Sequence, residues 1–289
     1  MSATAATASK PNQVEALDAP VHIGAVSLRV RDLPGLTAFY RDAIGLSLIS
    51  ERPTESVLGV AGLPLIRLEA GAQAPSSAAG LFHLALLLPS RADLANWLAH
   101  ATRKRLPLEG ASNHLVSEAL YLSDPEGNGI EIYRDRSRPE WPRLDGGSIK
   151  MSTERLDLDA LLREADGRDY AGMPEGTVMG HIHLRVGDVA AAEAFYRDTL
   201  GFEVMVHYPG ASFMATGGYH HHIAANVWHS RGAGPRRADE AGLSRFELVA
   251  RDDAAFASLR QRMLAAGGDE AEGPPAIADP WGNRVVLRR

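Results

Sequence analysis

Cysteine is absent from the 289-residue chain. The protein can therefore form no disulfide bond, and it has neither a thiolate metal ligand nor a cysteine nucleophile. Any metal site must take its ligands from histidine, aspartate and glutamate; the chain has 11 histidines and 36 acidic residues. Imidazole and carboxylate ligands suit divalent first-row transition metals. The composition thus narrows the available chemistry before any motif is considered.

The chain also lacks an excess of basic residues and any long apolar run. Its formal net charge is −6, so no positive field is available to attract a nucleic acid backbone. The longest apolar stretch, LFHLALLLP from Leu81, is far shorter than the roughly 18 residues that cross a bilayer. Residues 1–20 are small and polar and do not have the features of a secretory signal, so we expect a disordered arm there. We therefore expect a soluble, cytoplasmic protein without a nucleic acid or membrane partner.

What the chain does contain is an internal repeat. GAVSLRVRDLPGLTAFYRDAIGL from Gly24 and GHIHLRVGDVAAAEAFYRDTLGF from Gly180 match at 11 of 23 aligned positions. Each reads as a short strand, an aspartate that begins a helix, and a glycine, Gly45 or Gly201, that ends it. A second pair, DPEGNGIEIYR from Asp124 and DPWGNRVVLRR from Asp279, predicts a turn that leads into a final strand.

A strand followed by an amphipathic helix is also expected from Leu81 and from Leu243, so this unit occurs four times. We place the four modules at about 22–80, 81–135, 178–230 and 243–289. They group into two domains, 21–135 and 178–289. The linker at 136–177 contains prolines and glycines, and LDLDALLREAD within it predicts one helix.

Several of these segments resemble a known family. NHLVSEALYLSDPEGNGIEIY, MGHIHLRV and GGYHHHIAANVW are similar to segments of the vicinal oxygen chelate superfamily, which includes glyoxalase I, bleomycin-resistance proteins and extradiol dioxygenases. Within it they look most like the Bacillus-type catechol 2,3-dioxygenases. The resemblance extends over nearly all of the chain after residue 20. It implies an α+β fold in which four βαβββ modules form two cup-shaped sheets.

The resemblance also implies where metal ligands would lie, namely on the first and last strands of paired modules. In the second and third modules these positions hold His83, Glu131 and His181. In the first and fourth modules they hold residues that are unsuited to bind a metal: Ala25, Leu68, Arg245 and Val286. A complete set of ligands forms only if the second module faces the third. We predict that pairing, with His83, Glu131 and His181 as ligands in the two-histidine, one-carboxylate arrangement of non-haem Fe(II) oxygenases.

Each predicted ligand has a structural alternative. A glutamate between two apolar residues on a strand can simply face solvent, and a histidine in an apolar strand can be buried against a backbone carbonyl. His183, two residues after His181, would point to the same side and could belong to the core or support the metal ligands.

The run His220-His221-His222 is the sharpest local signal. If it lies on a strand, at least one imidazole must point inward. Aligned on the Ile-Ala that follows, the family's acid/base histidine pair maps to His220 and His221. Aligned on Asn226 and Trp228, His222 becomes a fourth metal ligand instead. The two alignments differ by one residue and hence by one face of a strand, so we keep both His221 and His222 as candidate catalytic residues.

Two further residues match a family segment that hydrogen-bonds substrate oxygens. Tyr121 has the family spacing, ten residues before Glu131, and is the third candidate catalytic residue. His114 is two residues out of the family spacing. The alternatives are a tyrosine of the core and a histidine of a loop.

These expectations combine into a functional hypothesis: an extradiol dioxygenase that cleaves a catechol-like aromatic diol with Fe(II), or Mn(II), and O₂. One rival is a glyoxalase-type isomerase with Zn or Ni held by four ligands, including His222. Another is a metal-free protein that binds small molecules such as drugs. A homodimer is left open.

Overall fold

Two curled β-sheets, each built from both halves of the chain, form the centre of the molecule. The computed structural model describes residues 15–74, 79–237, 239–271 and 273–289. The smaller sheet has the order β15 (Ala276–Ala278), β16 (Arg284–Arg288), β14 (Gly242–Ala250), β1 (Val21–Val30), β4 (Leu63–Ala70), β3 (Glu55–Val60) and β2 (Ser47–Arg52). The larger sheet has the order β11 (Glu203–Tyr208), β12 (Ala211–Ala215), β13 (Ile223–Asn226), β10 (Val178–Arg185), β5 (Gly80–Leu87), β8 (Gly129–Asp135), β7 (Ser117–Ser123), β6 (Gly110–Asn113) and β9 (Glu154–Arg155).

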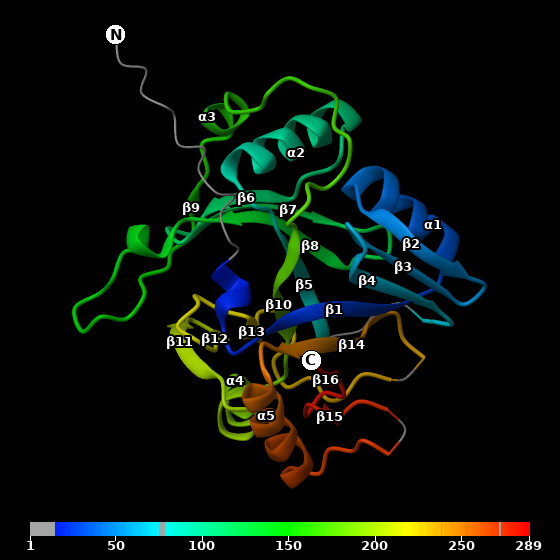
Figure 1. Ribbon diagram of the computed structural model, residues 1–289, viewed down its shortest axis with the longest axis vertical. Coiled ribbons are helices and arrows are strands. Elements are labelled where there is room, and N and C mark those ends of the chain that lie inside the picture. Colours follow the sequence, from blue (N-terminus) through cyan, green and yellow to red (C-terminus); the bar gives the residue numbers. More distant parts are fainter. Residues whose placement is uncertain (1–14, 75–78, 238, 272) are drawn as a thin grey trace.

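This strand order confirms the predicted pairing of modules. In the larger sheet, β5 of the second module lies antiparallel to β10 of the third. In the smaller sheet, β1 of the first module lies antiparallel to β14 of the fourth. Each cup is therefore completed across the two halves of the chain and not within either half (Figure 1).

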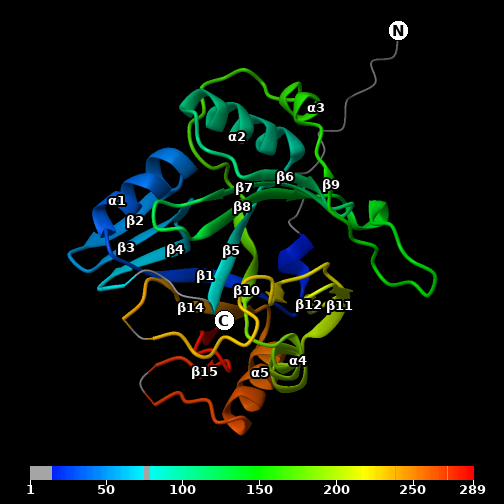
Figure 2. The ribbon, with the colours of Figure 1, turned by 180° about the vertical axis from the view of Figure 1, so that it is seen from behind.

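Helices lie at the two ends of the molecule and cover the outer faces of the sheets (Figures 1 and 2). At one end are α1 (Leu33–Ala38), α2 (Arg91–Lys104) and α3 (Leu158–Leu162), and at the other are α4 (Val189–Glu193) and α5 (Asp253–Ala265). The helical turns η2 (Phe39–Ile44) and η4 (Ala194–Thr199) continue α1 and α4, and η1 (Glu15–Asp18) and η3 (Arg138–Glu140) are short. Among the described residues, no helix is long and apolar enough to span a membrane.

The repeated start of each module has a simple local cause. A polar residue after the first strand accepts a hydrogen bond from the amide three residues later, which satisfies one free N–H at the start of the helix. Asp32, Ser90, Asp188 and Asp252 all do this. Gly45, with φ of 97°, ends the first of these helices in the left-handed conformation that a residue without a Cβ adopts at little cost.

Three local predictions differ from the structure. The segments Phe39–Ile44 and Ala194–Thr199 are π-helical, although a plain α-helix was expected. The predicted linker helix is present but is only Leu158–Leu162. Most of the predicted arm lies outside the described residues, but Glu15–Asp18 at its end forms a 3₁₀ turn in which Ala16 is fully buried, so this part is ordered by packing.

Candidate metal centre

His83, Glu131 and His181 meet on one face of the larger sheet because of its register. Ala85 on β5 pairs with Glu131 on β8 at one side and with His181 on β10 at the other. His83 lies two residues before Ala85 on the same strand, so its side chain points to the same face. The predicted convergence of these three residues is confirmed, and it brings candidate ligands from both halves of the chain to one point.

The three donor atoms are close enough to share one ion. The Nε2 atoms of His83 and His181 lie 3.0 and 3.1 Å from the same Glu131 oxygen, Oε2, and 3.3 Å from each other. Adjacent ligands of an octahedral ion with bonds of ~2.1 Å are ~3.0 Å apart, whereas tetrahedral ligands are ~3.4 Å apart. The three measured distances lie between these two values, so the donor set and its spacing fit a divalent ion.

Burial shapes the charges at this point. Burial alone would disfavour the Glu131 carboxylate, but the electrostatic and hydrogen-bonding effects of His181 and His83 outweigh it and hold the pKa of Glu131 well below its ordinary value. Burial lowers the pKa of His181 to about 4, although Glu131 opposes that shift. An ionised carboxylate and a neutral imidazole are the protonation states that bind a metal. Among the described groups, nothing accepts a hydrogen bond from Nδ1 of His181.

The three-histidine run lies in a loop and not on a strand, which corrects the expectation from the sequence. The turn at Gly217 and Gly218, both with positive φ, leads out of β12, and β13 begins only at Ile223. Strand alternation therefore does not apply. His220 and His221 instead lie side by side, with their Nδ1 atoms 2.8 Å apart.

Of the three, His221 is the residue that faces the predicted ligands. Its ring centroid is 4.1 Å from that of His181, and it lines the cavity beside the centre. Burial lowers the pKa of His221 well below its ordinary value, and the neighbouring imidazoles add to the shift. A neutral imidazole at this place can accept a proton.

His222 has a different environment from that of His221, and its role in catalysis or as a fourth ligand stays a prediction. Its Nε2–H donates to the carbonyl of Ala16, and its Nδ1 accepts from the amide of Thr216. Burial lowers the pKa of His222 to about 3. Both nitrogens are thus occupied by backbone groups, and the side chain ties the η1 turn to the loop.

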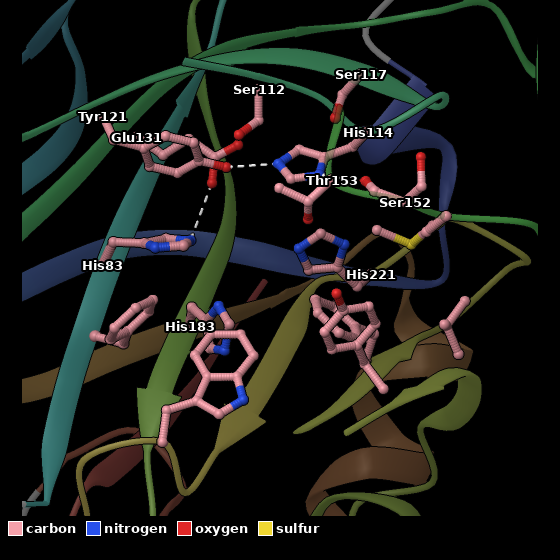
Figure 3. A pocket seen from close by; sticks show the side chains of 16 residues that line it. His83, Ser112, His114, Ser117, Tyr121, Glu131, Ser152, Thr153, His183 and His221 are labelled. Carbon is pink, nitrogen blue, oxygen red and sulfur yellow. Dashed lines mark hydrogen bonds and ion pairs between the residues drawn. The ribbon is translucent and has the colours of Figure 1, made fainter. Parts of the chain in front are cut away.

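Tyr121 and His114 lie together opposite His221 (Figure 3). Nδ1 of His114 donates to the carbonyl of Ser152 over 2.7 Å, which leaves Nε2 of a neutral ring to accept from the Tyr121 hydroxyl, also at 2.7 Å. Burial raises the pKa of Tyr121 well above its ordinary value, and Glu131 raises it further. Tyr121 is paired with Glu131 across β7 and β8, so its hydroxyl is held at the edge of the centre.

These groups form one wall of a cavity of about 310 Å³. Apolar and aromatic side chains form much of the remaining wall, and no described residue that lines it is lysine or arginine (Figure 3). The lining residues are Phe82, His83, Ser112, His114, Ser117, Tyr121, Glu131, Met151, Ser152, Thr153, His183, Val206, Tyr208, Phe213, His221 and Trp228. A small, flat, uncharged molecule with a polar edge fits this distribution.

Asp135 is the residue of this region that the sequence analysis missed. Its carboxylate accepts a hydrogen bond from His220 at 2.8 Å and one from Tyr219 at 2.7 Å. The strand period could have revealed it, because Glu131, Tyr133 and Asp135 alternate along β8 and share one face. His183, in contrast, was noted and does line the cavity; its Nε2 is 2.9 Å from Nδ2 of Asn226.

Comparison with known proteins assigns the class. The model of the Glyoxalase/Bleomycin resistance protein/Dioxygenase superfamily matches residues 22–132 and 178–287, and the chain belongs to this family. Among its relatives is the Catechol-2,3-dioxygenase of Bacillus subtilis (strain 168). The two are 38% identical over 268 residues, which cover 90% of this chain and 94% of that protein.

Solved structures show the same fold at low sequence identity. Glyoxalase I from Zea mays has a TM-score of 0.56 and is 15% identical, with 94% of each chain covered. The cppA protein from Streptococcus pneumoniae TIGR4 has a TM-score of 0.54 and is 12% identical, with 92% of this chain and 98% of that chain covered. At this level of identity the likeness concerns the arrangement of strands and helices.

Proposed function

We propose that the protein is an extradiol dioxygenase that cleaves an uncharged catechol with Fe(II) and O₂. The observation that carries the proposal is the position of His221. It lies beside the His83, Glu131 and His181 donors and faces the same cavity, but is not one of the three converging donors. The relative named Catechol-2,3-dioxygenase supports the same reaction.

Each group of the site has a role in this reaction. A divalent ion held by the three donors would supply positive charge and open coordination positions for adjacent oxygens. His221 would accept a phenolic proton, because its ring is not needed as a ligand. Tyr121, held by His114, would orient a substrate oxygen. Phe82 and Trp228 would pack against the ring and keep water away from it.

The surroundings of His222 favour the dioxygenase over the isomerase alternative. It requires four ligands, and the fourth, His222, makes hydrogen bonds with the backbone of Ala16 and Thr216. Within the described part of the chain, the group that could hold an ion near this cavity comprises His83, Glu131 and His181 alone. Three ligands with an open side suit an oxygenase better than a closed four-ligand site.

Oxygen uptake tests the proposal. Protein purified without oxygen and loaded with Fe(II) should consume O₂ when catechol or 4-methylcatechol is added, with the ring-cleaved product appearing at the same rate. A catechol that carries a carboxylate on its ring should react at least about tenfold more slowly, since no lysine or arginine among the described lining residues can pair with that carboxylate. Iron-replete protein that consumes no O₂ with any uncharged catechol would contradict the proposed reaction.

A further inference from the structure

A chain of hydrogen bonds leads from the end of β8 to the wall of the cavity. Oδ1 of Asp135 is 2.8 Å from Nε2 of His220, and Nδ1 of His220 is 2.8 Å from Nδ1 of His221. Nothing in the proposed reaction uses Asp135 or His220 directly. His220 is fully buried, and the Asp135 side chain is 15% exposed.

The proton positions along this chain follow from the carboxylate. Both Asp135 oxygens accept, Oδ1 from His220 and Oδ2 from the Tyr219 hydroxyl at 2.7 Å. Since an ionised carboxylate has no proton to donate, Nε2 of His220 must carry one. A neutral His220 then has a lone pair on Nδ1, and the proton between the two rings belongs to Nδ1 of His221.

The consequence appears at the far nitrogen of His221. A neutral ring that is protonated on Nδ1 has its lone pair on Nε2, which is the nitrogen not engaged by His220. The opposite arrangement would put a proton on Nε2 and leave the ring unable to accept one there. The hydrogen-bond chain therefore determines whether His221 can act as a base.

We propose that Asp135, acting through His220, is a positioning residue that fixes the tautomer of His221 with the Nε2 lone pair facing the cavity. Its catalytic consequence rests on the proposed function of His221 as the base. The arrangement itself depends only on the three side chains and their hydrogen bonds, so it can be tested separately.

The first measurement is independent of turnover. In protein labelled with ¹⁵N-histidine, metal-free or loaded with diamagnetic Zn²⁺, the His221 signals should show a protonated Nδ1 and an unprotonated Nε2. The His221 signals are assigned as those that disappear from the spectrum of a His221→Asn variant. The Asp135→Asn variant can offer an amide N–H to His220 in place of an oxygen, so a substantial fraction of Nε2 of His221 should become protonated.

The second measurement is kinetic. Asp135→Asn should lower kcat about 10- to 10³-fold, with metal content and KM close to those of the wild type, as expected for a base in the wrong tautomer. Tyr219→Phe is the matched control, because it removes a hydrogen bond to the same carboxylate but leaves the one to His220. Its kcat should fall at most about threefold.

A third variant keeps the test decisive if Asp135→Asn does not fold. His220→Gln can accept from His221 through its amide oxygen and donate to Asp135 through its nitrogen, whereas His220→Leu can do neither. The Gln variant should keep the wild-type tautomer and a kcat at least about tenfold above that of the Leu variant.

Two results would overturn the inference: a protonated Nε2 on His221 in the wild type, or a wild-type tautomer and kcat in Asp135→Asn. If the tautomer is as expected and changes in Asp135→Asn, but the wild type cleaves no catechol, the inference stands and the proposed function fails.

Discussion

At the scale of single residues, the three adjacent histidines have three different environments. His220 is hydrogen-bonded to a carboxylate, His221 faces the cavity, and His222 is hydrogen-bonded to backbone groups. Residue type is the same in each case, so the surroundings alone assign the chemistry. The histidines can be distinguished by substituting them one at a time.

His221→Ala should retain its metal while kcat falls about 10²–10⁴-fold, the usual contribution of a positioned acid/base group. The His221 ring contacts His181 but is not one of the three converging donors. Metal content measured by elemental analysis should therefore stay near that of the wild type. Loss of metal together with activity would instead make His221 a ligand.

His222→Ala should also retain metal, but the protein should be less stable. The change leaves the carbonyl of Ala16 and the amide of Thr216 without their partner, at a cost of about 1–3 kcal/mol in the free energy of unfolding. Urea unfolding measures this, with His229→Ala, an exposed histidine, as the control. Metal loss in the His222 variant at unchanged stability would restore the four-ligand hypothesis.

Glu131→Gln should weaken metal retention roughly tenfold or more. The amide keeps the shape of the side chain but removes the negative charge that both imidazoles share. Dialysis against a graded series of chelator concentrations, followed by elemental analysis, gives the comparison. Equal retention in the variant and the wild type would show that Glu131 has a structural role.

At the scale of elements, a buried tyrosine–aspartate hydrogen bond occurs once in each half. The hydroxyl of Tyr40 in η2 donates to Asp124 at 3.0 Å, and that of Tyr196 in η4 donates to Asp279 at 2.9 Å. The aspartates begin the repeated turns that precede β8 and β16. Each bond thus ties a helix of one module to the last strand of the next.

Tyr40→Phe should lower the free energy of unfolding by about 1–3 kcal/mol, because the buried Asp124 carboxylate loses a donor that water cannot replace. Urea unfolding provides the measurement. Tyr208→Phe, whose side chain is exposed, should change stability by less than about 0.5 kcal/mol. A Tyr40→Phe protein as stable as this control would make the hydrogen bond unimportant.

The secondary-structure elements also explain which parts of the candidate site could be predicted from the sequence. The convergence of His83, Glu131 and His181 was predictable because all three lie on strands, where equivalent positions in repeated modules stay equivalent in space. The histidine run was not, because Gly217 and Gly218 turn the chain and the strand begins after the run, at Ile223. The strand period places Asp135 on the same face as Glu131, but its contact with His220 could not be predicted, because His220 lies 85 residues further along the chain.

At the scale of the whole molecule, the candidate metal centre links the two halves. His83 and Glu131 belong to one half and His181 to the other, so a bound ion should stabilise the complete fold. At a free metal concentration 100 times Kd, the stabilisation is about 2.7 kcal/mol. Urea unfolding with and without Mn(II) should show this shift in the wild type and much less of it in Glu131→Gln. Identical midpoints for the wild type with and without the ion would rule out a site in the folded state.

The pairing of the sheets across the halves also has a consequence for biosynthesis. While the ribosome is still making the second half, β1 and β5 have already emerged. Their partner strands, β14 and β10, are not yet available to pair with them. For example, the backbone amide of Ala25 donates a hydrogen bond to Glu247, which is translated 222 residues later. Until the second half has been translated, both sheets have unpaired strand edges, and such edges promote aggregation of nascent chains. The ion can be captured only after His181 has been translated, 98 residues after His83, so we expect metal loading to follow translation of the larger sheet.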